Sequence, residues 1–215
     1  HGKVKVHTDR NFRIFKKMEN EGVEFSPRDM YYYANELMDN GQYAKAIDEY
    51  KRFIATKQGW IEDVKGAYFR IINCYKILNK TENILDIVFE AFKIDVPMAE
   101  IVCSLAEYFF EKNNFNQAAF WYKTALNCIP NKDNPSLSNI AYYSWIPSLQ
   151  LCVCYYNLGK INCAYFFNEL TANFVGESDK VIYNRKLFDD IYENLNMKKP
   201  NLKYPLRADD YINYL

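Results

Sequence analysis

Length, composition and charge narrow the function classes. The chain has 215 residues, and its 27 Lys and Arg side chains balance its 27 Asp and Glu side chains, so it offers no bulk attraction to nucleic acid or anionic lipid. It contains 7 Gly and 7 Pro, too few for an all-β chain rich in tight turns. No stretch reaches the ~18 uncharged apolar residues of a membrane span, and no signal peptide is visible. We therefore expect a cytoplasmic helical protein that binds no nucleic acid.

The N-terminal residues predict a linker and one extra helix. Because the chain opens with His1-Gly2 rather than Met, residues 1–8 are interpreted as a linker from a missing N-terminal domain. Residues 9–20 carry apolar side chains at helical spacing, and they predict a helix that precedes the main array.

The middle of the chain repeats one helical pattern. Residues 40–53 and 113–125 each contain a polar turn and an aromatic residue, followed by small, aromatic and apolar or small residues at offsets 3, 7 and 10. These offsets lie on one face of an α-helix. In the first copy the four positions are Tyr43, Ala46, Tyr50 and Phe53. Weaker copies begin at Thr81 and Ile161, so the pattern occurs in four places.

Each of these helices follows another helix with a different apolar pattern, at offsets 0, 3, 4 and 7. The four sets are Met30, Tyr33, Ala34, Leu37; Tyr68, Ile71, Ile72, Tyr75; Val102, Leu105, Ala106, Phe109; and Ser148, Leu151, Cys152, Tyr155. A Gly- or Asn-containing turn follows each set, as expected at a helix C-terminus. Four helix pairs are therefore predicted, at about residues 27–55, 62–95, 97–130 and 144–174.

The spacing of the pairs predicts the fold. The 34 residues from Ile84 to Ala118 match the period of the tetratricopeptide repeat, and the alternation of large and small residues resembles that repeat. The longer spacing before the fourth pair falls in a loop around residues 130–138. A helix at 179–195 is predicted to cover the last repeat. The predicted fold is all-α, a tetratricopeptide-like α-solenoid of about four helix pairs with flanking helices within residues 9–195.

The last residues are predicted to form a tail rather than another repeat. Residues 196–215 are polar and aromatic and include Pro200 and Pro205. We expect extended structure here, docked back on the array through Tyr204 and Tyr211.

The sequence contains no constellation that predicts catalysis or metal binding. The six cysteines fall inside helical patterns and are interpreted as reduced, mostly buried thiols, and His1 and His7 are too few to complete a metal site. The acidic pairs at 189–190 and 209–210 are adjacent residues and not an Asp-x-Asp motif. No Gly-rich phosphate loop or nucleophile elbow is present. We therefore predict no catalytic residue, no metal site and no cofactor in this region.

Several phrases between the repeats resemble those of bacterial family 2 glycosyltransferases. Residues 10–17 (RNFRIFKK) are similar to a helix that follows the catalytic domain in that family. Residues 59–63 (GWIED) and 144–156 (SWIPSLQLCVCYY) are similar to its repeat region. The resemblance covers about residues 8–192 and includes the type of enzyme that glycosylates a peptide or bacteriocin.

The resemblance implies a context for this chain. In that family a separate N-terminal domain binds a nucleotide sugar and a divalent metal, while the helical repeats lie outside the sugar-transfer site. The chain would then be a non-catalytic repeat domain of a glycosyltransferase, acting in self-association as a homodimer or in acceptor recruitment. The alternative is a stand-alone adaptor that binds a peptide in its concave groove. Under both hypotheses the partner is a protein or a peptide.

A groove is predicted along one face of the first helices of the pairs. The residues expected to line it are Arg28, Tyr31, Asn35, Met38, Phe69, Asn73, Lys76, Glu100, Cys103, Glu107, Phe110, Leu149, Val153 and Tyr156. Aromatic side chains there would anchor a partner, and the two Asn side chains would bond its backbone. The groove lacks the Lys and Arg cluster that would bind a terminal carboxylate.

Other aromatic residues carry weaker hypotheses. The side chains of Trp60, Trp121 and Trp145 could stack on a sugar, although packing is the preferred interpretation. The run of residues 31–33 (YYY) points round more than one side of a helix, so part of it is expected to lie in an interface.

Overall fold

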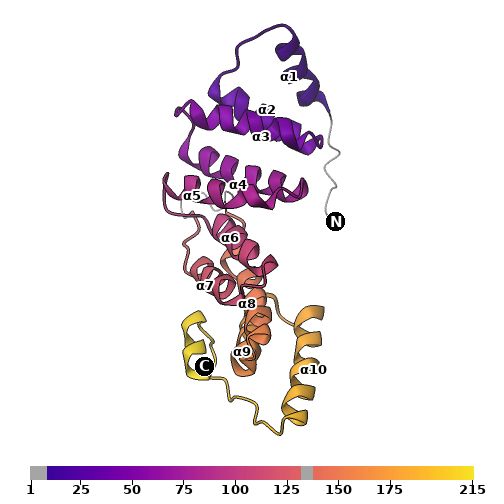
Figure 1. The fold of residues 1–215 in the computed structure, drawn as a ribbon, viewed down its shortest axis with the longest axis vertical. Helices are drawn as coiled ribbons and strands as arrows, with labels where there is room; N and C mark the ends of the chain where they lie inside the picture. The colour runs from indigo at the N-terminus through magenta and orange to yellow at the C-terminus, as the bar shows by residue number, and fades with distance from the viewer. Residues whose placement is uncertain (1–8, 132–137) are drawn as a thin grey trace. The chain divides into compact units, whose positions relative to one another are not determined.

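The computed structural model describes residues 9–131 and 138–215, which form helices and no β-strand (Figure 1). The α-helices are α1 (Arg10–Asn20), α2 (Pro27–Asp39), α3 (Tyr43–Ala55), α4 (Ile61–Ile77), α5 (Ile84–Phe92), α6 (Ala99–Glu111), α7 (Phe115–Leu126), α8 (Trp145–Asn157), α9 (Ile161–Val175) and α10 (Asp179–Asn194). Three 3-10 helices are η1 (Thr81–Asn83), η3 (Ile140–Tyr143) and η4 (Ala208–Tyr214). The predicted all-α fold of four helix pairs with flanking helices is confirmed. The predicted linker 1–8 and residues 132–137 of the predicted loop lie outside the described residues.

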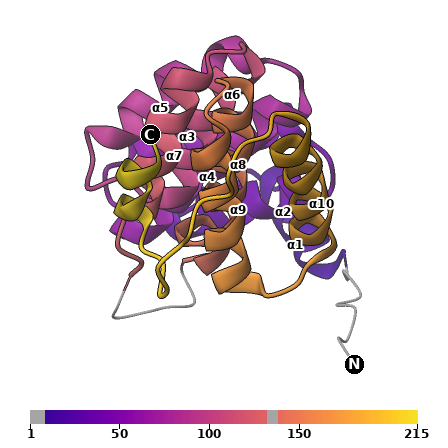
Figure 2. The same ribbon diagram turned by 90° about the horizontal axis from the view of Figure 1, so that it is seen from below.

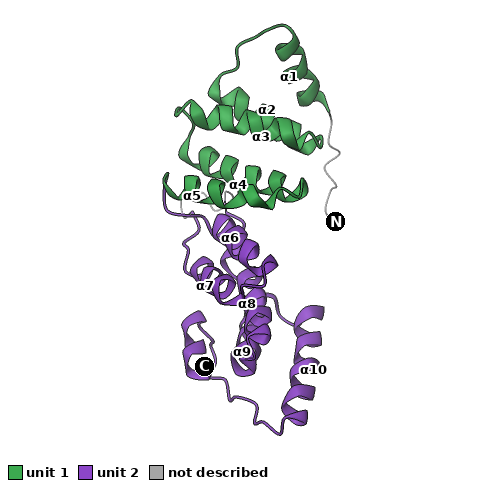
Figure 3. Cartoon of the chain, in the orientation of Figure 1, with its two compact units in different colours: residues 1–94 green, residues 95–215 purple. Residues whose placement is uncertain are grey.

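The chain divides into two compact units (Figure 3). Unit 1 comprises residues 1–94 and unit 2 comprises residues 95–215. Each unit contains two of the four helix pairs. The single domain expected over residues 9–195 stays a prediction.

Unit 1 is built on a capped helix and an aromatic core. At the start of α2 the Ser26 hydroxyl accepts a bond from the Asp29 N–H, and the Asp29 carboxylate accepts one from the Ser26 N–H, so two otherwise unpaired donors are satisfied. Successive helices from α2 to α5 pack against each other. Between them Tyr33, Tyr50 and Phe53 are at most 2% exposed. Burial of these rings stabilises the unit.

The second helix of the second pair is shorter than predicted. The pattern from Thr81 to Ala91 was expected to form one helix, but residues 81–83 form the 3-10 turn η1 and the α-helix begins at Ile84. Thr and Asn are poor helix formers, and a 3-10 turn is common at a helix end. The apolar positions Ile84 and Val88 are nevertheless buried as expected.

In unit 2 the helices α6 to α10 pack in chain order, each against the next. The small residues Ala118 and Ala164 have no exposed surface, as expected where two helices approach closely. Pro147 lies in the first turn of α8, where the missing N–H of proline removes no helical bond.

A buried carboxylate holds the segment before α8 against α6. Glu100 is 2% exposed. It accepts hydrogen bonds from the Asn139 N–H at 2.8 Å and from the Tyr143 hydroxyl at 3.0 Å. These bonds compensate the burial of the charge, and they fix η3 beside α6. Tyr142 is thereby placed next to Cys103 in the N-terminal half of α6.

A second buried carboxylate fixes α10. Glu169 of α9 is 3% exposed and receives both Nε and Nη2 of Arg185 at 2.8 Å. Beside it, the Asn168 amide bonds the Val181 carbonyl, and the Asn184 amide bonds the Asn168 oxygen. This two-pronged ion pair within a hydrogen-bonded cluster sets the position of α10 on α9.

The tail differs in part from the prediction. Residues 208–214 form the 3-10 helix η4 and are not extended. Figure 2 shows this segment returning along unit 2, and η4 packs against α9. Tyr211 lies against the rings of Tyr155 and Phe167, so the expected docking of Tyr211 is confirmed. Tyr204 is 60% exposed, and its hydroxyl donates to a carboxylate oxygen of Glu169, 3.4 Å away.

Candidate functional site

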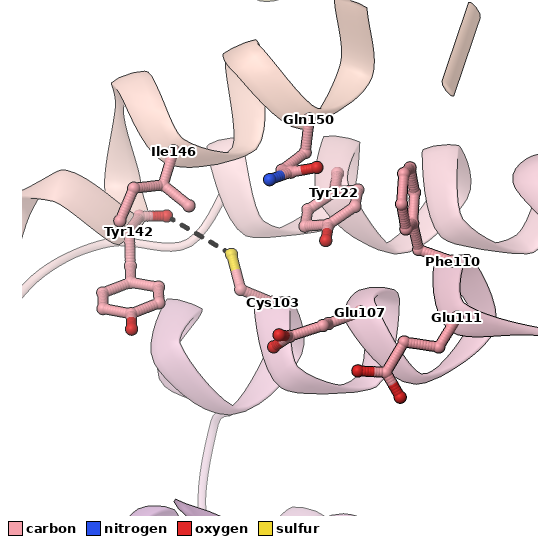
Figure 4. Close-up of a pocket in the computed structure, with 8 residues that line it drawn as sticks. All are labelled: Cys103, Glu107, Phe110, Glu111, Tyr122, Tyr142, Ile146 and Gln150. Atoms are coloured by element: carbon pink, nitrogen blue, oxygen red, sulfur yellow. Dashed lines mark hydrogen bonds between the residues drawn. The ribbon is translucent and has the colours of Figure 1, made fainter. Parts of the chain in front are cut away.

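A pocket of about 400 Å³ opens between α6 and α8 in unit 2 (Figure 4). Its described lining residues are Cys103, Glu107, Phe110, Glu111, Tyr122, Tyr142, Ile146 and Gln150. The volume is that of a site for a side chain or small ligand. It lies wholly within one compact unit, so its geometry is set by local packing.

Three helices and the η3 segment place the lining residues. Cys103, Glu107 and Glu111 are spaced four residues apart on α6 and therefore form one stripe along that helix. Gln150 projects from α8 toward α6, as Figure 4 shows. The thiol of Cys103 donates to the carbonyl of Tyr142 at 3.8 Å, and this contact connects η3 to α6.

Tyr122 reaches the pocket from α7, and its ring is part of the core. It is 3% exposed, and burial raises the pKa of its hydroxyl, with the charge of Glu107 adding to the rise. The hydroxyl points into the space between α6 and α8 (Figure 4).

The pocket is acidic and aromatic. Glu107 and Glu111 carry its charge, and none of its described lining residues is basic. Phe110, Tyr122 and Tyr142 supply aromatic surface. Two carboxylates beside aromatic rings form an environment that favours a cation.

A second pocket of about 490 Å³ adjoins the first and shares Gln150 with it. It lies between α8 and α10, and its lining residues are Leu149, Gln150, Val153, Asp179, Lys180, Tyr183 and Asn184. Both hollows therefore border α8. The two hollows are called together the α6–α8–α10 groove.

The predicted groove residues of unit 2 lie in or near this groove. Glu107 and Phe110 line the first pocket, and Val153 lines the second. Tyr156 is 41% exposed on α8 but lines neither pocket. Glu100 was expected in the groove, but it is buried and bonded to the η3 segment.

The predicted groove residues of unit 1 have mixed surroundings. Tyr31 is 8% exposed and packs against Phe53, so it belongs to the core of the unit. The Asn35 oxygen accepts a bond from the Tyr50 hydroxyl at 2.6 Å and is therefore already occupied. Arg28 is exposed and stacks over the Tyr32 ring. The half-buried members are Met38, Phe69, Asn73 and Lys76. A single groove through all four pairs stays a prediction.

The other aromatic candidates are distributed as follows. In the run of residues 31–33 only Tyr32 is exposed, at 44%, so the predicted interface is reduced to that residue. Trp60 is 55% exposed, whereas Trp121 and Trp145 are half-buried. Trp145 lines a hollow of about 380 Å³ beside the start of α10.

Five residues of the first pocket were not predicted to face it, namely Glu111, Tyr122, Tyr142, Ile146 and Gln150. The predicted face of the first helices used offsets 1, 5 and 8 from the first apolar position. Gln150 and Glu111 lie at offsets 2 and 9, slightly further round their helices. Tyr122 was expected only as a packing residue. The Tyr122 side chain is long enough that its ring packs in the core while its hydroxyl reaches the groove.

The described residues contain no group of three or more His, Cys, Asp or Glu side chains arranged to hold a metal ion. In the same part of the chain, every helix is too short or too polar to cross a bilayer.

Comparison with known proteins identifies the fold and no family. No protein-family model matches the sequence. No curated protein matches it significantly. Among solved structures, a putative kinesin light chain from Podospora anserina with nearly identical tetratricopeptide-like repeats aligns with a TM-score of 0.52 and 12% identity. The alignment covers 89% of this chain and 95% of that one. The chain therefore has a tetratricopeptide-like helical repeat fold.

Proposed function

We propose that the chain is a non-catalytic helical repeat domain that binds a protein segment in the α6–α8–α10 groove. The observation that carries this proposal is the groove itself. Two hollows share Gln150 in their lining, and the ring of the buried Tyr122 lines one of them. An extended segment lying across first helices is one way a repeat protein engages a partner.

The groove has the mixed character that peptide recognition needs. Aromatic and aliphatic side chains supply apolar contact, from Phe110 in the first hollow to Val153 and Tyr183 in the second. Gln150 lines both hollows, and its carboxamide can donate to and accept from a peptide backbone. Aromatic anchors with a few oriented polar groups are typical of binding sites.

The proposed context is the repeat region of a bacterial family 2 glycosyltransferase, where the bound segment would belong to the acceptor. The support is the resemblance of residues 10–17, 59–63 and 144–156 to that family. The last of these phrases covers α8 except for its final residue, and α8 is the central helix of the groove. A longer natural protein with an Asp-x-Asp motif after a strand upstream of residue 1 would support this context. A gene that encodes no such domain would contradict it.

A matched pair of variants tests the proposal. A phage-displayed library of random dodecapeptides is selected on the purified chain, and the selected peptides are measured by calorimetry. Gln150→Arg should block binding because a larger side chain fills the junction of the hollows. Gln117→Arg on α7, an exposed position outside both hollows, should leave it unchanged. Equal binding by both variants, or no selected peptide, would refute the proposal.

In the same glycosyltransferase context, the chain could instead bind a second copy of itself. Sedimentation velocity of the purified chain distinguishes it, since a homodimer that uses the groove would be dissociated by Gln150→Arg. A monomer at all concentrations leaves a foreign segment as the occupant.

A further inference from the structure

We infer that the surface of unit 2 beneath η4 is a docking site for a partner segment of the form Asp-Tyr-x-x-Tyr, and that the chain's own C-terminal segment occupies this site in the structure. The receptor residues are Lys123 of α7, Tyr155 of α8, and Cys163, Phe166 and Phe167 of α9. None of them is among the described residues that line the α6–α8–α10 groove. The inference therefore goes beyond the proposed function and does not depend on it.

The segment η4 is seated on unit 2 as a bound peptide would be. None of its residues is buried, and Ile212 is 60% exposed, whereas Tyr211 and Tyr214 are half-buried. Side chains three residues apart eclipse each other on a 3-10 helix, so the two tyrosine rings share one face. The segment therefore contacts the body of unit 2 through that face and leaves the opposite face in water.

The first anchor is Tyr211, whose ring and hydroxyl are both recognised. The ammonium of Lys123 donates to the Tyr211 hydroxyl at 2.8 Å and lies 4.8 Å from the centre of its ring. The ring centres of Phe167 and Tyr155 are 5.5 and 5.7 Å from that of Tyr211. A cation beside an aromatic ring and paired rings at these distances both favour a tyrosine at this position.

The second anchor is Tyr214. Its ring stacks on Phe166, with the two centres 5.4 Å apart and the planes inclined by 26°. The thiol of Cys163, which has no exposed surface, donates to the Tyr214 carbonyl at 3.2 Å. The receptor thus binds the backbone of the segment as well as its side chains, as expected in peptide recognition.

The aspartate of the motif fixes the turn that presents the two rings. The Asp210 carboxylate accepts a hydrogen bond from the Arg207 N–H at 2.8 Å, and the Asp210 N–H donates to the Arg207 carbonyl at 3.0 Å. These two bonds close the first turn of η4. A segment that carries this aspartate is ordered before it docks, so it loses less entropy on binding.

The tether between α10 and η4 allows the segment to be replaced. Its side-chain polar contacts with the described body are the surface ion pair of Lys199 with Asp189 and the 3.4 Å bond from Tyr204 to Glu169. An exposed ion pair contributes little, and Leu206 is the one buried residue in 195–215. The tether nevertheless keeps η4 at a high effective concentration, so the chain's own segment competes with a partner for the site.

The test uses a fluorescent synthetic peptide with the sequence of residues 203–215, added to the whole chain. The double variant Tyr211→Ala, Tyr214→Ala lacks both anchors in its own segment and should bind the peptide about 30-fold more tightly than the natural chain does. Adding Lys123→Met to this variant should weaken binding about tenfold. Adding Gln150→Arg, which changes only the groove, should have no effect. A peptide with alanine at both tyrosine positions is the matched control and should not bind.

Tyr211→Phe keeps the test decisive if the double variant does not fold. It removes only the hydroxyl bond, so this variant should bind the peptide about threefold more tightly than the natural chain does. Equal binding to the natural and variant chains, or binding that ignores Lys123→Met, would overturn the inference. A natural chain that forms a dimer in sedimentation, lost on Tyr214→Ala, would identify a second copy as the occupant and overturn the assignment to a foreign partner.

Discussion

The ammonium of Lys123 donates a hydrogen bond to the hydroxyl of Tyr211, 2.8 Å away, across a sequence separation of 88 residues. Lys123 belongs to α7, and Tyr211 belongs to η4 near the end of the chain. The same tyrosine ring lies against Tyr155 and Phe167. The thiol of Cys163 also donates to the Tyr214 carbonyl at 3.2 Å. The C-terminal segment is therefore an integral part of unit 2.

This relationship predicts that Tyr211 stabilises the fold. Tyr211→Ala should lower the free energy of unfolding by about 2 kcal/mol, because it removes ring contacts from a partly exposed position. Tyr211→Phe should lower it by about 1 kcal/mol, since only the hydrogen bond is lost. Urea unfolding followed by circular dichroism measures both values. Ile212→Ala, at a side chain that is 60% exposed, is the control, and a loss as large as that of Tyr211→Ala would contradict the docking.

The buried carboxylate of Glu49 predicts a pH dependence. It is 6% exposed, and one of its oxygens has no hydrogen-bond partner among the described residues, although the other bonds Arg52. Burial raises the pKa of Glu49 above its usual 4.5, and the nearby charges of Glu19 and Asp48 act in the same direction. The folded state therefore holds this proton more tightly than the unfolded state.

The sign of the effect follows from that proton. Stability contributed by protonated Glu49 is present at and below pH 4.5 and is lost as the pH rises through the folded pKa. The free energy of unfolding of Glu49→Gln should therefore exceed that of the natural chain by more at pH 7 than at pH 4.5. Urea unfolding at both values measures this difference. If the variant instead gained stability over the natural chain at the lower pH, burial would not be disfavouring the ionised form of Glu49.

The repeat register predicts the effect of enlarging Ala118. This side chain has no exposed surface and lies where α6 and α7 pack. Ala118→Leu should lower the free energy of unfolding by about 1–3 kcal/mol because a larger side chain separates the helices. Gln117→Leu, on the exposed side of the same helix, should change it by less than about 0.5 kcal/mol. Equal effects at the two positions would contradict the register.

The cysteines should react slowly with thiol reagents while the chain is folded. Five of the six are buried, and only Cys128 is half-exposed. Burial raises the pKa of Cys74 to about 11 and that of Cys152 and Cys154 to about 12, so few thiolates exist at neutral pH. Colorimetric titration at pH 8 should detect at most one fast thiol per folded chain and all six after unfolding. Two or more fast thiols in the folded chain would disprove this.

Local patterning made the fold predictable. The offsets that define each helix pair place Ala46, Ala118 and Ala164 at fully buried positions, because the same residues that form a helix face also determine its packing. The 3-10 turn at residues 81–83 and the helix η4 were not predicted. Both are short segments whose structure depends on neighbouring surfaces rather than on their own periodicity.

The candidate site was only partly predictable. Glu107 and Phe110 were identified because the inner face of a first helix follows from the register. Tyr31 was misplaced because α4 packs over it, which the pattern of α2 alone does not reveal. Tyr142 enters the pocket only because buried Glu100 binds the adjacent η3 segment, a contact between residues about 40 positions apart. Such long-range contacts leave no periodic signal in a sequence.

Hydrogen–deuterium exchange of the whole chain, with and without the tightest selected peptide, tests the central claim most directly. Binding in the α6–α8–α10 groove should slow exchange in residues 99–111 and 145–157, which are α6 and α8. The same peptide should give no protection in the Gln150→Arg variant. Protection confined to unit 1 or to the η4 segment, with α6 and α8 unchanged, would contradict the claim that this groove is the binding site.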